Sequence, residues 1–219
     1  MLKKAPKQAR SEEMVSCILA GATRVLRSTR LADATTNRIA EVAGVSVGSV
    51  YQYFRSKETI ATTLFCRHLK ESVLLLRRIR IESRGYPAEK RLRMPFVELL
   101  RDHRADRMLH HNLMGVMEAS RAAGDTQSLI NEIVGEVAAV LGEEFPNIDQ
   151  NEIRLCAALR QRSCVVLVHT AISDPALDRD SVVLDHFDSL SKANLKTLGS
   201  RSVLRVSRNP ATPAPPHAG

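Results

Sequence analysis

The sequence predicts an all-α protein in which a small three-helix unit precedes a larger helical domain. Apolar residues recur at the i, i+3, i+4 spacing of one helical face along most of the chain, from Val15 to Leu198. No segment alternates apolar and polar residues as a half-buried strand would. The clearest interruption is Glu82–Pro87, which contains Gly85 and is taken as the domain boundary.

Charge is distributed unevenly along the 219 residues, whose net charge is +8. Residues 1–80 hold 15 Lys and Arg against 6 Asp and Glu, whereas residues 81–219 hold 17 against 18. A cationic N-terminal surface would attract phosphates through counterion release. Charge alone is equally compatible with an ordinary basic N-terminus, so a nucleic-acid partner has to be argued from a motif.

The two ends of the chain lack the apolar helical periodicity of the rest. Residues 1–10 are basic, contain Pro6 and show no apolar periodicity, which predicts a flexible arm. Residues 201–219 turn polar and then Pro-rich, which predicts a disordered tail.

The first helix is predicted to begin at Ser11 and to pack its apolar face on the two helices that follow. The segment Thr35 to Phe54 then predicts two short helices. Threonines at its start can cap the first of them, and Gly44 suits the left-handed position that ends it. Ser46 is placed to cap the second helix, Val47 to Tyr53. Two helices joined in this way form a helix-turn-helix, whose second helix enters the DNA major groove.

A fourth helix is predicted to begin at Ser56 and to run to about Arg80, so that residues 11–80 form a helix-turn-helix domain with a linker helix. Residues 81–200 are predicted to be helical throughout. Pro95 should kink or divide the first helix of this part, because proline lacks the backbone N–H that a helix interior uses.

The run T-T-N-R-I-A-E-V-A-G-V-S-V-G-S-V-Y-Q-Y-F-R-S-K-E, Thr35 to Glu58, resembles the DNA-binding domain of TetR-type transcriptional regulators. That family typically shows a capping Thr, I-A-x-x-A-G-V-S, a small residue, Y-x-Y-F and S-K-E, in this order. One departure is that Arg30 and Leu31 stand where the family usually has Gly before an aromatic residue. The resemblance implies a homodimeric repressor that binds a pseudo-palindromic double-stranded DNA operator and is released by a small-molecule effector.

The resemblance also implies which residues meet DNA. The start of the recognition helix should lie nearest the base edges, and the small Gly48 and Ser49 let it sit deep in the groove. Gln52 can read an adenine if it faces the bases. Tyr53 is expected to anchor a phosphate, with a core position as the competing interpretation. The residues expected to contact DNA are Thr36, Asn37, Ser46, Val47, Gly48, Ser49, Tyr51, Gln52, Tyr53 and Lys57.

The larger domain is expected to hold the effector and to need no cofactor. Methionine is soft and adaptable, which suits a ligand site, although plain core packing is an alternative for the same residues. His103 and His110 are seven residues apart and so share a helical face, but no third ligand lies near them in sequence, and no metal site is predicted. The residues expected to line the ligand site are His103, His110, Leu113, Met114, Met117, Glu118, Cys164 and His169.

The last two long helices, predicted over about 150–172 and 181–198, are the expected dimer surface. A two-helix face paired with its twin makes a four-helix bundle. Their apolar residues have to be divided between this surface and the core of each chain. The candidates for the dimer surface are Leu155, Ala158, Leu159, Val165, Val166 and Ala171 on one helix, and Val182, Phe187, Leu190 and Leu195 on the other.

Several classes of protein are disfavoured. The sequence has no phosphate loop, no G-x-S-x-G and no H-E-x-x-H, so no enzyme is predicted. No secretory signal is seen, and no apolar run approaches the ~20 residues that span a bilayer, so a cytoplasmic protein without a membrane partner is expected. Four scattered cysteines in apolar settings predict buried, reduced thiols.

Two regulatory functions remain open from the sequence. One is the ligand-controlled repressor, and the other is a ligand-independent DNA-binding regulator whose second domain serves only dimerisation. A roomy cavity in the larger domain would favour the first, and a fully packed core would favour the second.

Overall fold

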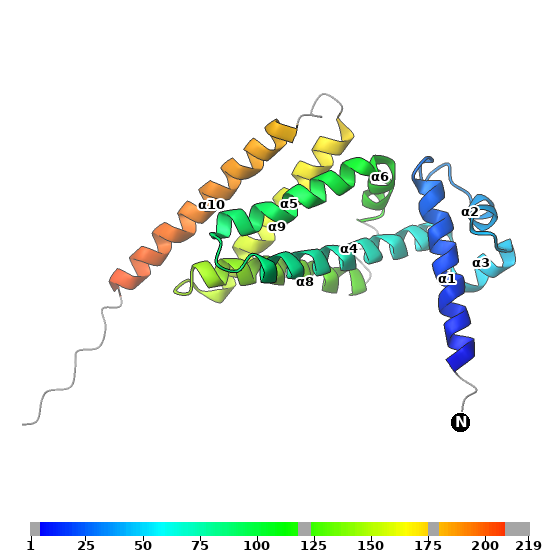
Figure 1. The fold of residues 1–219 in the computed structure, drawn as a ribbon, viewed down its shortest axis with the longest axis horizontal. Coiled ribbons are helices and arrows are strands. Elements are labelled where there is room, and N and C mark those ends of the chain that lie inside the picture. Colours follow the sequence, from blue (N-terminus) through cyan, green and yellow to red (C-terminus); the bar gives the residue numbers. More distant parts are fainter. Residues whose placement is uncertain (1–4, 118–123, 175–179, 209–219) are drawn as a thin grey trace, which may run out of the picture.

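A computed structural model describes residues 5–117, 124–174 and 180–208. Glu118 and the Pro-rich end of the predicted tail lie outside these ranges. Within them every regular element is an α-helix, as predicted. The helices, labelled as in Figure 1, are α1 (Ala5–Leu26), α2 (Thr36–Ala43), α3 (Val47–Tyr53), α4 (Lys57–Glu82), α5 (Ala88–Ala105), α6 (Arg107–Gly115), α8 (Gly124–Glu144), α9 (Gln150–Ser173) and α10 (Asp180–Arg208).

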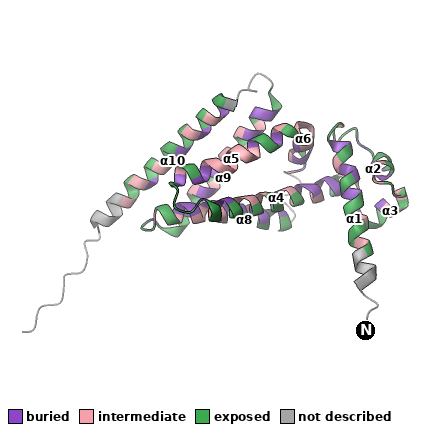
Figure 2. Cartoon of the chain, in the orientation of Figure 1, coloured by how far each residue is buried: buried purple, intermediate pink, exposed green. Residues whose placement is uncertain are grey.

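The helices form a small head, α1 to α3, and a larger body, α5 to α10, with α4 joining the two (Figure 1). α4 leaves the head and runs along the body against α8, which in turn packs on α9. Buried residues follow inward-facing stripes of α4 and α8, whereas much of α10 is exposed (Figure 2). The head is therefore carried on one long helix whose other end is embedded in the body.

The predicted starts of α2, α3 and α4 are confirmed by their caps. The side-chain oxygens of Thr35, Ser46 and Ser56 accept hydrogen bonds from backbone N–H groups in the first turns of α2, α3 and α4. Gly44 ends α2 with a φ of 71°, the left-handed conformation that costs glycine least. α2 also lies very close to α1 at Gly21. A Cβ added at Gly21 would come within 2.6 Å of the Cβ of Ala43.

The loop after α1 closes with Arg30 and Leu31 and without a glycine, and none of the described non-glycine residues has a positive φ. Three of the backbone polar groups at this end of α1 and in the loop bond to Asn112 of α6. The Asn112 amide nitrogen donates to the carbonyls of Leu26 and Thr29, at 2.9 Å each, and its amide oxygen accepts from the N–H of Leu31 at 2.8 Å. One side chain of the body therefore caps the C-terminal end of α1 in the head.

Several sequence expectations differ from the structure. α1 begins at Ala5, so residues 5–10 are helical rather than a flexible arm; they are mostly good helix formers, and Pro6 lies in the first turn, where its missing N–H costs nothing. α10 continues to Arg208, so the chain remains helical past residue 200. Of the two outcomes predicted at Pro95, a kink or a division, the helix α5 is not divided, because proline removes only one helix hydrogen bond.

The cysteine prediction is partly wrong. The four cysteines are free, and Cys66, Cys156 and Cys164 are half-buried. Cys17, however, is exposed, because it lies on the outer side of α1 next to the buried Ile18. Burial raises the pKa of the Cys164 thiol to about 11, so that this thiol is protonated at neutral pH.

The structure divides the apolar residues of α9 and α10 between the core and an exposed face. Ala171 and Phe187 are buried within the chain, and Ala158, Val165 and Leu195 are half-buried. The exposed ones, with their exposed fractions, are Leu155 (61%), Leu159 (55%), Val166 (63%), Val182 (39%) and Leu190 (47%). By length and composition α9 is also apolar enough to cross a membrane, and only 28% of its apolar window is buried in this single chain.

Candidate nucleic-acid interface and ligand cavity

The outer side of α3 is exposed, whereas its inner side builds the core of the head. Val50 and Phe54 are buried against α1 and α4. Gly48, Gln52 and the two tyrosines face solvent, and the exposed fractions of Tyr51 and Tyr53 are 56% and 38%. The Tyr53 hydroxyl lies 3.5 Å from that of Ser11 in α1. Tyr53 is therefore a surface residue, whereas Phe54 is a core residue.

The remaining residues of the predicted DNA surface differ in their exposure. Asn37 and Ser46 are exposed, and Ser49 is half-buried with its hydroxyl 2.8 Å from that of Ser46. Val47 is half-buried and packs against the core of the head. Thr36 is buried, so its side chain contributes little to the exposed surface.

Lys57 holds the head together from the start of α4. Its ammonium group donates hydrogen bonds to the backbone carbonyls of Ala32 and Ala34, at 2.7 and 2.9 Å. These carbonyls belong to the loop between α1 and α2. Sequence reasoning expected this ammonium to bind a DNA phosphate, but in the structure two of its three protons are directed at the protein backbone.

We expect Lys57→Met to lower the free energy of unfolding by roughly 1–3 kcal/mol, because hydrogen bonds from a charged donor to two carbonyls are lost. Chemical denaturation of the two proteins measures this difference. Lys70→Met is the matched control, since Lys70 is exposed on the same helix, and its stability should change by less than about 0.5 kcal/mol. Equal stability of Lys57→Met and wild type would contradict the structural role.

The body contains an elongated cavity of about 440 Å³. The residues of α4 that line it run from Phe65 to Arg80, and fifteen residues of helix span roughly 22 Å, which sets the length of the cavity along α4. Its walls are mainly apolar. The apolar residues that α5, α8 and α9 contribute include Leu92, Phe96, Leu99, Ile130, Ile133, Val137, Val140, Val165 and Val168.

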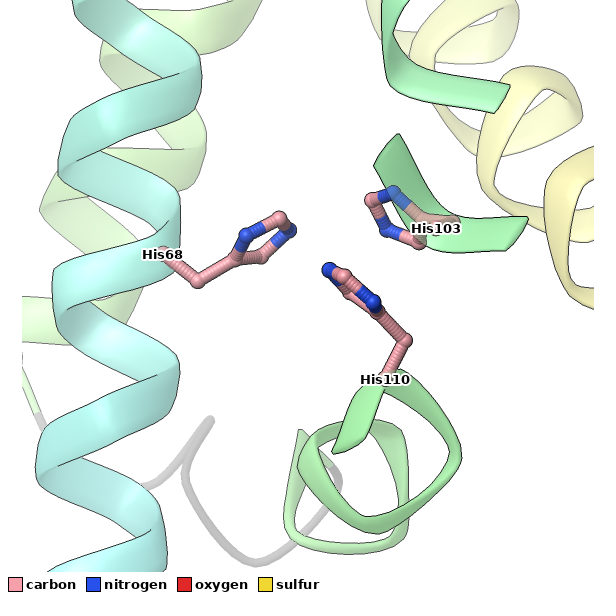
Figure 3. Close-up of side chains that lie close together, drawn as sticks. All are labelled: His68, His103 and His110. Atoms are coloured by element: carbon pink, nitrogen blue, oxygen red, sulfur yellow. The ribbon is translucent and has the colours of Figure 1, made fainter. Parts of the chain in front are cut away.

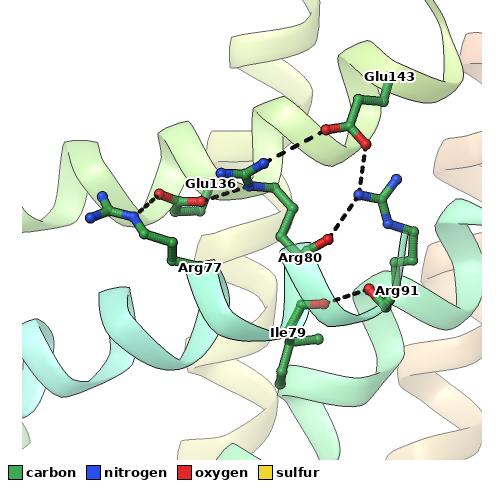
Figure 4. Close-up of polar contacts among 7 residues, drawn as sticks. Arg77, Ile79, Arg80, Arg91, Glu136 and Glu143 are labelled. Carbon is green, nitrogen blue, oxygen red and sulfur yellow. Dashed lines mark hydrogen bonds and ion pairs between the residues drawn. The ribbon is translucent and has the colours of Figure 1, made fainter. Parts of the chain in front are cut away.

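The end of the cavity remote from the head carries a network of ion pairs between α4, α5 and α8 (Figure 4). Glu136 pairs with Arg77 and Arg80, at 2.8 Å each, and Glu143 pairs with Arg91 at 2.7 Å. Burial alone would raise the pKa of the Glu136 carboxyl, but the hydrogen bonds from Arg80 and Arg77 hold this pKa below its usual range. Glu136 is therefore ionised at neutral pH and neutralises part of the arginine charge.

Buried cationic and polar groups at the cavity retain hydrogen-bonding capacity. Arg91 is 5% exposed, and its Nε has no hydrogen-bond partner among the described residues; the same holds for Nε2 of His169. Arg160 of α9 is also buried, donates to the hydroxyl of Ser191 and lies over the ring of Phe187. An apolar cavity with these few polar groups fits a ligand that is largely apolar and carries an acceptor or an anionic group.

The residues predicted to bind a ligand fall into three groups. Those that line the cavity are His103, Met114, Met117, Cys164 and His169. His110 and Leu113 instead border an open groove between α1 and the helices α4 to α6. Glu118 lies outside the described residues. Sequence reasoning missed His68, Arg91, Arg160 and Asn112, because helical periodicity marks each of them only as a polar residue of an amphipathic helix.

Both parts of the chain match families of known proteins. Residues 18–63 match the model of bacterial regulatory proteins of the tetR family, and residues 89–186 match that of the tetracyclin repressor-like C-terminal domain. The chain belongs to the TetR family. TetR-family proteins are DNA-binding transcription regulators rather than a family of enzymes. No curated protein sequence matches this chain.

Solved structures of TetR-family proteins share its fold. The repressor AlkX from Dietzia sp., implicated in biodegradation of n-alkanes, is 20% identical with a TM-score of 0.58, covering 84% of this chain and 94% of its own. The regulator FadR from Bacillus subtilis, in complex with stearoyl-CoA, is 19% identical with a TM-score of 0.59, covering 84% and 96%. RolR in complex with resorcinol is 16% identical with a TM-score of 0.59, covering 95% and 98%. At these identities the likeness establishes the fold alone.

Proposed function

We propose that this TetR-family protein is a cytoplasmic repressor that binds a pseudo-palindromic operator as a homodimer and is released by a small-molecule effector. The observation that carries the proposal is the exposed outer face of α3, a capped helix of small and polar residues presented at the tip of the head. A helix of this kind can enter the major groove without displacing any part of its own protein.

Side chains around α3 are of the types that bind phosphates of the DNA backbone. Tyr51, Tyr53 and Asn37 are exposed beside the proposed base-reading face, and Arg55 adds an exposed cation directly after it. Side chains of these types hold phosphates and set the register of the helix, whereas Gly48, Ser49 and Gln52 are placed to meet base edges. Binding should therefore weaken steeply as salt rises, because each neutralised phosphate releases counterions.

Dimerisation is proposed through the exposed apolar face of α9 and α10. Leu155, Leu159 and Val166 lie four and seven residues apart, so they form one stripe along α9, and α10, which packs against α9, exposes Val182 and Leu190. An exposed apolar stripe of this kind marks an interaction site, and a two-fold axis lets the same stripe cover its own copy. The same contact accounts for the apolar character of α9 without a membrane.

The cavity supports control by an elongated, largely apolar effector with an anionic group. Its wall is apolar over most of its length, and Arg91 and Arg160 provide buried guanidinium groups. The complexes of FadR with stearoyl-CoA and of RolR with resorcinol agree with small-molecule control of this fold. A cavity of about 440 Å³ favours this function over a ligand-independent regulator, which would gain stability from a packed core.

The proposed control is tested with operator DNA and a probe ligand. We expect a long-chain fatty acid to raise the melting temperature of the protein and to lower its affinity for DNA from upstream of its own gene. An effector that releases the operator must bind the DNA-free protein more tightly than the DNA-bound protein, so both readouts should change together. Binding of the fatty acid without any effect on DNA affinity would contradict effector control.

We expect Arg160→Met to weaken fatty-acid binding by about 10-fold or more, since a hydrogen bond to a charged group contributes roughly 1.5–3 kcal/mol. Methionine keeps the approximate volume of the buried side chain, so that the packing against Phe187 is largely retained. Isothermal titration measures the affinity. The exposed Arg154 on the same helix supplies the control, Arg154→Met, which should bind as wild type does. Equal affinities of all three proteins would exclude Arg160 as the anion-binding group.

A further inference from the structure

Three imidazoles from three helices meet where the end of the cavity nearest the head adjoins the groove that His110 borders. His68 projects from α4, His103 from the end of α5 and His110 from α6, and their rings point toward one another (Figure 3). The possible ligand atoms of the three all lie within 4.8 Å of one another. The rings of His103 and His110 stack at 3.8 Å, although the two residues belong to different helices rather than to one helical face.

Two of the imidazoles are oriented by backbone carbonyls. Nδ1 of His103 lies 2.8 Å from the carbonyl oxygen of Leu99, and Nδ1 of His110 lies 3.1 Å from that of Asp106. A carbonyl oxygen only accepts, so each Nδ1 carries the proton and donates it. This leaves the lone pair of each ring on Nε2. A histidine that binds a metal through one ring nitrogen usually donates the N–H of its other ring nitrogen to an acceptor such as a backbone carbonyl.

The surroundings also keep the rings uncharged, as metal ligands must be. Burial lowers the pKa of His103 to about 2, with further contributions from the two neighbouring histidines, and burial together with His110 lowers that of His68 to about 4. Burial also lowers the pKa of His110. At neutral pH all three imidazoles are therefore neutral and have lone pairs available.

We propose that His68, His103 and His110 form a binding site for a divalent transition-metal ion of the zinc class. Imidazole nitrogen suits zinc, copper, nickel and iron, whereas magnesium and calcium prefer oxygen ligands. A tetrahedral ion with Zn–N bonds of about 2.0–2.1 Å holds its ligand nitrogens roughly 3.3 Å apart, so side-chain rotations that close the present separations suffice. Three protein ligands leave a fourth position for water or a ligand.

The ion would fasten together the helices that position the head. α4 runs from the head into the body, and α6 contacts the head through Asn112, whose side chain caps α1. One ion coordinated by residues of α4, α5 and α6 therefore restricts how the head can move relative to the body. If the protein binds an operator as proposed above, restricting the head in this way changes the affinity of the protein for the operator. This part of the inference rests on the proposed function.

Metal binding is tested first with the full-length, tag-free protein after dialysis against a chelator. We expect one equivalent of Co²⁺ to give the visible absorption of a nitrogen-ligated tetrahedral ion, and Zn²⁺ but not Mg²⁺ to displace it. His68→Gln is the main variant, because His68 is only half-buried and its replacement should leave the fold intact by circular dichroism. The exposed neighbour of His110 provides the control, His111→Gln.

His68→Gln should weaken zinc binding by more than the roughly 10- to 100-fold that losing an outer-shell partner costs, whereas His111→Gln should bind as wild type does. A wild-type protein without the cobalt absorption would overturn the site, and so would zinc affinity unchanged in a folded His68→Gln. Operator titrations with zinc and with chelator then test whether metal binding changes the affinity for DNA. Equal operator affinities in the two titrations would overturn this coupling. A protein that binds cobalt but no DNA in either state would instead contradict the proposed function.

Discussion

Leu159→Glu is expected to convert the proposed dimer to a monomer and to lower its operator affinity by about 10²–10⁴-fold, the usual gain from linking two binding modules. Leu159 is 55% exposed in the single chain, at the centre of the stripe formed with Leu155 and Val166. A glutamate there faces apolar surface of the partner, and across a two-fold axis it can also face the other copy's glutamate. Both effects oppose association without disturbing the core of the chain.

Sedimentation velocity measures the association, and fluorescence anisotropy with labelled duplex measures the affinity. Because the substituted side chain is exposed, the stability of the monomer fold should change by less than about 0.5 kcal/mol. Leu74→Glu is the matched control, since Leu74 is an exposed leucine of α4 that lies away from the α9–α10 face, and it should remain dimeric. A Leu159→Glu protein that still dimerises would place the interface elsewhere.

Gly48→Leu is expected to abolish specific DNA binding while leaving the protein folded. A Cβ at Gly48 meets only the hydroxyl oxygen of Ser46, at 3.8 Å, so the free protein has room for a side chain. Leucine also has the better helix propensity, and the head should be as stable as in wild type or slightly more so. In the groove the added side chain keeps α3 away from the base edges. We expect affinity to fall by about 100-fold or more, or roughly 3 kcal/mol, equal to the loss of one to three base contacts.

Gly142→Leu is the control for this substitution, because Gly142 lies on α8, far from the head, and a Cβ there meets nothing within 4 Å. Its operator affinity should equal that of wild type. Thermal unfolding monitored by circular dichroism verifies that both variants are folded. Operator binding by Gly48→Leu with wild-type affinity would mean that the outer face of α3 does not enter the groove.

The head could be predicted from the sequence because its determinants are local. A capping hydroxyl acts on an N–H three residues away, as Thr35, Ser46 and Ser56 do, and Gly44 ends α2 through its own backbone conformation. The start of α1 was predicted too late because Ser11 resembles a cap, although the residues before it are themselves good helix formers.

The interior of the body could not be predicted in the same way. Helical spacing identifies a buried face but not the residues of other helices that pack on it. His68 joins His103 and His110 only because α4 packs against α5 and α6, and sequence separation conceals that meeting. The contact of Lys57 with the loop after α1 is likewise non-local, so its sequence position suggested a phosphate contact instead.

Selection of binding sites from a library of random duplexes tests the central claim most directly, because it presumes no operator. With the full-length protein at moderate salt, we predict enrichment of an inverted repeat whose half-sites lie about one helical turn apart, bound by two chains per duplex. Enrichment should be lost with Gly48→Leu. A selected pool that shows no sequence preference over the starting library would contradict a sequence-specific, dimeric DNA-binding regulator.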